Sequence, residues 1–361
     1  MKRLILAKRN INVKANAGEA NNGIDKDRSL ISRIPYINLI ITCGMKSIML
    51  TLLGAAITSV ASAQFVPYSQ YHLNPLLTNP AHAGMTNDAK LLFQYRQAKV
   101  ANYEIPAISF LYPLFINNGR SKMRYGGIGL TVIRQSSGPG NLFNTTGAIG
   151  GFAYNLHLSR EHHLSVGLQG GIVNKRIDVS KVTTESQFSG GVYDPSLFHG
   201  ENFNNTSVTR PVINAGFSWY LTDRKNQQKA SLGAALYNMN RPSYDILSHG
   251  NKETVTYVIS GEVEAWKKDR FSLHPSFRYI LSHSSLTNIG MYAAYALSSQ
   301  HGEITAGAWY KSNKAVVFSA QYSHASYLIS AAYEFSAVAN LEANLNSAFE
   351  IVLGLKLDRT K

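Results

Sequence analysis

From residue 89 onward, polar and apolar residues alternate in runs of about ten, and turn residues separate the runs. Successive side chains of a β-strand point to opposite faces, so the pattern predicts strands with one apolar and one mixed face. We expect fourteen strands, at 89–98, 103–113, 124–135, 142–157, 161–175, 210–222, 228–240, 254–267, 270–282, 286–298, 301–311, 314–324, 325–336 and 346–357.

The alternation is clearest in the last two runs. In 346–357, one face holds Phe349, Ile351, Leu353, Leu355 and Leu357, and the other holds Ala348, Glu350, Val352, Gly354 and Lys356. The mixed face requires water or polar partners, whereas the apolar face requires lipid or a core. We expect Ile351 and Leu353 to face outward and Glu350 inward.

Run length and loop length favour a membrane barrel over a soluble sandwich. The runs are long enough to cross a membrane when tilted, and Tyr and Phe gather near their ends. Longer connections, at 176–209, 241–253 and 337–345, alternate with short turns. Because lipid offers no partner to a free sheet edge, the sheet must close. The prediction is an all-β transmembrane outer-membrane β-barrel of about 14 antiparallel strands, with a short non-strand segment before it.

Four parts are predicted along the chain. Residues 45–63 read "MKSIMLTLLGAAITSVASA", a secretory signal peptide with an A-x-A cleavage site, which predicts export through the Sec pathway. Residues 1–44 are then interpreted as a non-translated or mis-annotated extension, the alternative being a membrane anchor over 34–63. Residues 64–88 form an Asn-Pro-rich segment, and 89–361 form the barrel.

Composition narrows the functional classes. The chain is 45% hydrophobic and only 16% charged, with 28 glycines and a net charge of +14. Its basic residues are scattered without an aromatic-basic cluster, which argues against nucleic acid as a partner. Cys43 is the only cysteine, so no disulfide forms within the chain. Glycines at positions such as 127, 129, 150, 151, 170 and 171 would ease strand bending or accept aromatic neighbours, and conformational relief is the favoured reading.

The segment "YSQYHLNPLLTNPAHAGM", Tyr68 to Met85, shows neither strand nor helix period. Each proline biases the preceding residue away from helix, and asparagine side chains cap local backbone groups, which predicts an ordered segment. We interpret it as a plug of the barrel or as a periplasmic docking strip. The candidate partner-docking residues are Tyr71, Asn74, Pro75, Asn79 and Pro80.

Catalytic and metal-binding motifs are missing from the sequence. It contains no P-loop, no G-x-G-x-x-G after a strand, no H-E-x-x-H and no G-x-S-x-G. We therefore assign no catalytic, cofactor-binding or metal-binding residue, expect no cofactor, and predict that the protein is not an enzyme.

The opening phrase of the mature chain resembles that of the PorP/SprF family. That family begins with a phrase of the form F-S-Q-Y-x-x-N-P-x-x-x-N-P-A-Y-A-G. Here the matching residues are Tyr68-Ser69-Gln70-Tyr71, Asn74-Pro75, Asn79-Pro80-Ala81 and Ala83-Gly84, whereas Tyr68 and His82 replace the usual Phe and Tyr. The stretch Val192 to Phe198 and the closing run "SAFEIVLGLKL" are also similar to the family.

The resemblance implies an outer-membrane component of the type IX secretion system and gliding machinery of Bacteroidetes. It implies periplasmic ring and lipoprotein partners and, in SprF-like members, a large secreted adhesin. We expect an outer-membrane protein in contact with lipid, with both mature termini in the periplasm. The alternative is a passive porin or a fatty-acid-type transporter, and a membrane-embedded enzyme is the least favoured reading.

Overall fold

The structure is a computed structural model that describes residues 68–99, 102–117, 122–182, 185–189, 192–194, 196–197, 206–224, 226–244, 252–298, 302–336 and 347–357. All of them belong to the second of the two units of the chain, residues 58–361. The predicted parts at 1–44 and 45–63 lie outside the described residues.

Each of the fourteen predicted strands is found at its expected place. The barrel strands are β1 (Ala89–Ala98), β2 (Tyr103–Asn117), β3 (Lys122–Ser137), β4 (Phe143–His157), β5 (His162–Ile177), β8 (Ser207–Thr222), β9 (Gln228–Tyr237), β10 (Thr256–Val263), β11 (Trp266–Lys268), β12 (Phe271–Leu281), β13 (Ser285–Ser298), β14 (Gly302–Lys311), β15 (Ala315–Ser323), β16 (Tyr327–Ser336) and β17 (Ala348–Leu357). β10 and β11 both pair with β12 and form one interrupted strand. Outside the barrel wall, β6 (Phe188–Ser189) and β7 (Val192–Tyr193) pair in the β5–β8 connection, and η4 (Pro139–Asn141), η5 (Val179–Lys181) and η6 (Glu185–Gln187) are single turns.

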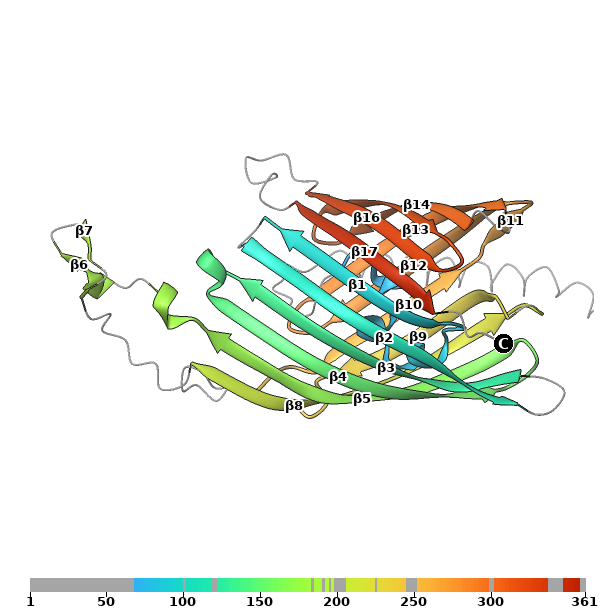
Figure 1. The fold of residues 1–361 in the computed structure, drawn as a ribbon, viewed down its shortest axis with the longest axis horizontal. Coiled ribbons are helices and arrows are strands. Elements are labelled where there is room, and N and C mark those ends of the chain that lie inside the picture. The colour runs from blue at the N-terminus through green and yellow to red at the C-terminus, as the bar shows by residue number, and fades with distance from the viewer. Residues whose placement is uncertain are drawn as a thin grey trace, which may run out of the picture. The chain divides into compact units, whose positions relative to one another are not determined.

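The described strands form a closed antiparallel ring of 14 strands (Figure 1). Each barrel strand pairs with the next barrel strand along the chain, except that β10 and β11, the two parts of one interrupted strand, both pair with β12. β1 and β17 close the ring over ten residue pairs, from Ala89 with Leu357 to Ala98 with Ala348. A closed ring leaves no sheet edge, which satisfies the backbone requirement of a membrane-spanning sheet.

The faces of the strands agree with the predicted alternation. On β17, Leu353 is 45% exposed on the outer surface, whereas Glu350 and Val352 are fully buried in the interior. On β16, Phe335 is half exposed and Glu334 is buried. The outer face is therefore apolar, and the polar groups point inward.

The two ends of the barrel differ in their connections. At the end where β17 finishes, which we call the turn end, the connections are 118–121, 158–161, 223–227, 269–270, 299–301 and 324–326. At the other end, which we call the loop end, they include 178–206, 238–255 and 337–347. The longer connections thus share one end, as the sequence predicted.

Candidate functional site

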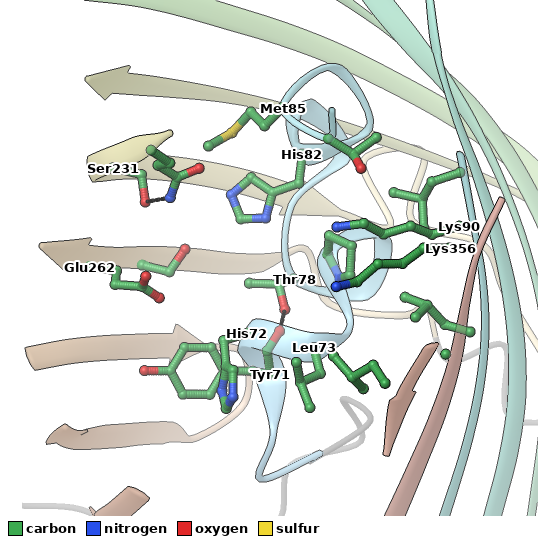
Figure 2. Close-up of a pocket in the computed structure, with 18 of the residues that line it drawn as sticks. Tyr71, His72, Leu73, Thr78, His82, Met85, Lys90, Ser231, Glu262 and Lys356 are labelled. Atoms are coloured by element: carbon green, nitrogen blue, oxygen red, sulfur yellow. Dashed lines mark hydrogen bonds between the residues drawn. The ribbon is translucent and has the colours of Figure 1, made fainter. Parts of the chain in front are cut away.

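The Asn-Pro-rich segment lies inside the barrel. Residues 68–86, which we call the plug, form the short helices η1 (Tyr71–Leu73), α3 (Pro75–Thr78) and η2 (Pro80–Gly84) (Figure 2). They pack against the inner faces of β3, β4, β5 and β8. The segment therefore lies in the lumen as a plug, which is one of the two positions predicted from the sequence.

The residue types of the segment explain its local structure. Pro75 and Pro80 stand at the first positions of α3 and η2, where a missing N–H costs no hydrogen bond. Asn79 is extended, as expected before proline, and its Oδ1 accepts a hydrogen bond from the Ala81 amide at 2.9 Å. Each Asn-Pro pair therefore begins a short helix, α3 after Asn74 and η2 after Asn79.

The five candidate docking residues all lie in the plug. The Tyr71 hydroxyl donates to Ser276 Oγ at 3.0 Å, and Asn74 Nδ2 donates to Gln94 Oε1. Asn79 Nδ2 donates to the carbonyl oxygens of Phe217 and Ala234, at 3.0 and 3.2 Å. Four of the five are buried, and Pro75 is half-buried. Their immediate contacts are with the barrel wall, and their part in partner binding remains a prediction.

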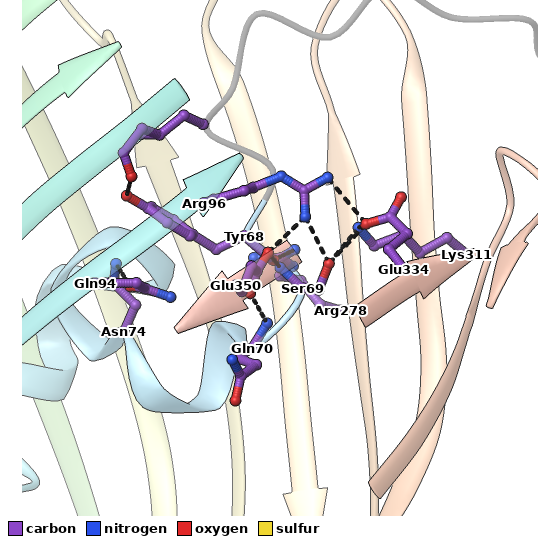
Figure 3. Close-up of polar contacts among 11 residues, drawn as sticks. Tyr68, Ser69, Gln70, Asn74, Gln94, Arg96, Arg278, Lys311, Glu334 and Glu350 are labelled. Atoms are coloured by element: carbon purple, nitrogen blue, oxygen red, sulfur yellow. Dashed lines mark hydrogen bonds and ion pairs between the residues drawn. The ribbon is translucent and has the colours of Figure 1, made fainter. Parts of the chain in front are cut away.

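Ion pairs anchor the start of the plug near the loop end (Figure 3). Arg96 of β1 and Glu350 of β17 are register partners, and their Nη1 and Oε1 atoms are 2.6 Å apart. Arg96 Nη2 and Lys311 Nζ lie 3.0 and 2.5 Å from Glu334 Oε2. Ser69 joins both carboxylates, because its amide donates to Glu350 and its hydroxyl donates to Glu334. Two cations thus balance two anions, as burial requires.

A fifth charge holds the same end of the plug. Arg278 is fully buried, its Nη2 donates to the carbonyl oxygen of Tyr68 at 2.7 Å, and its guanidinium lies 4.5 Å from the centre of the Tyr71 ring. The Gln70 amide donates to Glu350 Oε2 at 3.0 Å. Sequence reasoning placed Glu350 in the lumen but did not single out Arg96, Arg278, Lys311 or Glu334 as contacts of the plug.

Glycines of the wall make room for the plug, which corrects their interpretation as strand relief at 127 and 129. A Cβ on Gly129 would lie 2.5 Å from the Leu76 side chain, and one on Gly127 would collide with the Ala83 carbonyl. A Cβ on Gly167 would lie 2.5 Å from the Ala81 amide nitrogen. Gly170, in contrast, has nothing within 4 Å of such a Cβ. Gly127 and Gly167 therefore allow the plug backbone to approach the wall backbone, and Gly129 makes room for the Leu76 side chain.

Cavities lie on both sides of the plug. One of about 230 Å³ lies toward the turn end, between the plug and strands β1, β9, β10 and β17 (Figure 2). Another, of about 140 Å³, lies toward the loop end and is lined by Leu77 of α3 and by Tyr237, Lys175 and Glu253. The plug separates these two spaces.

Two histidines of the plug are kept neutral by burial. The His72 ring stacks between Tyr292 and Trp309, with ring centres 5.5 and 5.2 Å away. Burial lowers the pKa of His72 to about 4, and it lowers the pKa of His82 to about 4 as well. The seated plug therefore disfavours a proton on either ring at neutral pH.

In the part of the chain that the structure describes, no group of three or more His, Cys, Asp or Glu side chains is placed to hold a metal ion. No helix among those residues has the length and apolar character needed to cross a membrane.

Three solved structures illustrate what this chain is similar to in fold. A Pseudomonas aeruginosa FadL homologue is 13% identical, with 77% of this chain and 91% of that chain covered and a TM-score of 0.40. The Pseudomonas putida toluene transporter TodX is 10% identical, with coverage of 83% and 95% and a TM-score of 0.42. Acinetobacter baumannii Omp33 is 6% identical, with coverage of 76% and 100% and a TM-score of 0.38. At these scores the likenesses carry no information about what this chain binds.

Sequence comparison is more specific. No curated protein is similar enough to count as a relative. The family described as "Type IX secretion system membrane protein PorP/SprF" matches residues 60–355, a span that includes the plug and all barrel strands up to β17. The chain therefore belongs to the PorP/SprF family of type IX secretion system outer-membrane proteins.

Proposed function

We propose that this barrel is an assembly and anchoring component of the type IX secretion machinery, and that its plugged lumen is the working state. The observation that carries the proposal is the plug itself, which is held by Ser69, Asn74 and Asn79 through hydrogen bonds to the wall. A passive porin requires a water-filled lumen, whereas an anchor requires a rigid surface. Neither the family nor the fold suggests an enzyme.

The proposed orientation places the turn end in the periplasm and the longer loops outside. Outer-membrane barrels usually have short periplasmic turns and longer extracellular loops, and β17 finishes at the turn end. The C-terminus is then periplasmic, after export through the Sec pathway. The partners proposed for the turn end are periplasmic ring and lipoprotein components, with a large secreted adhesin as a further client.

The test replaces both Asn-Pro pairs, Asn74-Pro75 and Asn79-Pro80, with Gly-Ser. The change removes the wall contacts of both asparagines and the fixed turns, so the plug should loosen while the strand ladder is untouched. We expect an inserted, heat-modifiable barrel that no longer retains periplasmic partners in a pull-down from mild detergent and no longer supports secretion. Pro139→Ser, at an exposed turn of the loop end, is the matched control.

Normal secretion by the Gly-Ser variant would show that the plug has no role in assembly, and a barrel that fails to insert would make its role structural. The second candidate, passive transport, is favoured by the cavities on either side of the plug. A liposome-swelling assay distinguishes the two functions. Solute flux at porin-like rates through the unmodified protein would support transport, whereas flux only through the Gly-Ser variant would support a plugged anchor.

A further inference from the structure

Two lysines share one wall of the turn-end cavity. Lys90 of β1 and Lys356 of β17 are register partners, and both ammonium groups reach into the cavity beside the plug (Figure 2). Their strand neighbours Leu91 and Leu355 point outward. Like charges directly opposite each other destabilise a sheet unless a counter-charge lies between them.

Among the residues that the structure describes, no carboxylate forms an ion pair with Lys90. Lys356 Nζ donates to Ser323 Oγ and to the His324 carbonyl, both at 2.8 Å, and both acceptors are neutral. Lys90 forms no hydrogen bond or ion pair with any residue that the structure describes. Asp88 attracts the Lys90 ammonium electrostatically but forms no ion pair with it. An ammonium group that enters a cavity and bonds no described acceptor there is suited to an external anion.

The remaining walls are apolar over most of their area, and they also carry neutral polar side chains, among them Gln228, Ser231 and Ser260, and one carboxylate. The apolar side chains that line the cavity include Leu73 and Met85 of the plug and Leu92, Leu111 and Leu328 of the barrel. Glu262 lies on the facing wall, where its Oε1 accepts a hydrogen bond from the Tyr292 hydroxyl at 2.5 Å and lies 4.0 Å from His274 Nδ1. The lining thus carries two cations against one anion, and that anion is already engaged.

We propose that this cavity binds a small organic anion with an apolar body, with its carboxylate between Lys90 and Lys356 and its apolar part against the leucines and Met85. A cavity of about 230 Å³ is smaller than the ~300–1,000 Å³ typical of sites for drug-sized ligands, so the occupant is small. The ligand also contacts the plug through Leu73 and Met85, and so its binding favours the seated plug.

The experiment uses octanoate labelled with ¹³C at the carboxyl carbon and the purified barrel in a neutral maltoside detergent. A carboxylate resonance distinct from the micellar one should appear on titration. Lys90→Gln and Lys356→Gln should each weaken binding about tenfold, because each removes a charge-assisted contact. Lys268→Gln, on the exposed strand β11, should leave binding unchanged. Octanamide should not compete, and acetate, which lacks the apolar body, should bind more weakly.

A second probe, N-acetyl-leucyl-leucine, distinguishes a peptide carboxyl terminus from a lipid-derived chain. Binding of either carboxylate supports the anion site. The carboxylate that binds more strongly shows whether the natural ligand resembles a peptide carboxyl terminus or a lipid-derived chain. The proposal is overturned if neither carboxylate binds, if octanamide competes as well as octanoate, or if Lys90→Gln binds octanoate like the unmodified barrel. Unchanged heat-modifiable mobility shows that each variant is folded. None of these outcomes depends on the proposed role in secretion.

Discussion

At the scale of single residues, small side chains and amides determine how closely the plug approaches the wall. Asn79 donates to two main-chain carbonyls, and Gly167 admits the backbone of Pro80 and Ala81. The sequence allowed Asn79 to be singled out, because an Asn-Pro pair ahead of the first strand has the turn chemistry of an ordered segment. It did not reveal what Gly167 makes room for, because the contact joins residues more than eighty positions apart.

The close approach at Gly167 leads to a test. Gly167→Ala places a methyl group where the Pro80–Ala81 backbone lies, so the plug must shift while the outer face remains unchanged. Gly170→Ala, in the same strand, meets nothing within 4 Å. In planar bilayers we expect Gly167→Ala to conduct more ions than the unmodified barrel. We expect Gly170→Ala to conduct no more than the unmodified barrel. Equal conductance in both would mean that the plug tolerates the methyl group.

At the scale of elements, the sequence predicted the strands, but it did not predict the contacts that hold the plug in the barrel. Period-two alternation is a local property of the sequence, so β1 and β17 could be predicted within two residues of their observed ends. The plug has no period, and its anchor joins Ser69 to Glu334 and Glu350, far along the chain. Charged residues on a mixed strand face showed that something polar lies inside, without showing what.

The outer face of β17 gives a prediction about lipid. Leu353 lies in mid-strand and Leu357 at its end, and both are nearly half exposed. Leu353→Arg should destabilise the barrel by about 2–4 kcal/mol and Leu357→Arg by about 0–1 kcal/mol, because the cost of a charge falls toward the membrane interface. Urea unfolding in lipid vesicles measures both. Equal costs would mean that this face does not cross the bilayer.

The plug should loosen in acid. Burial lowers the pKa of His72 and His82 to about 4, whereas a released histidine titrates near 6.5. The released plug binds more protons than the bound plug. The bound position of the plug therefore becomes less stable relative to the released one as pH falls from about 6.5 toward 4. We expect conductance to rise over this range. The double variant His72→Gln, His82→Gln should lose most of the rise, and an unchanged rise would assign it to other groups.

At the scale of the whole molecule, the orientation of the barrel determines which connections meet the outside. Protease added to whole cells should cut within 176–209 and spare 223–227, since we place the loop end outside and the turn end in the periplasm. Mass spectrometry of the fragments identifies the cleavage sites. Cleavage confined to 223–227 would invert the proposed orientation.

The anchor of the plug also bears on how the molecule is assembled. β1 and β17 are the first and last strands made, so their pairing is the seam at which the ring closes. Arg96 and Glu350 face each other across that seam, and Ser69 and Gln70 bind the same carboxylate. Without the β1–β17 pairing nothing in the ring holds Arg96 beside Glu350, so the set of groups that binds Ser69 and Gln70 is incomplete. Closing the seam and seating the plug therefore stabilise each other, and a barrel with a misaligned seam cannot hold its plug.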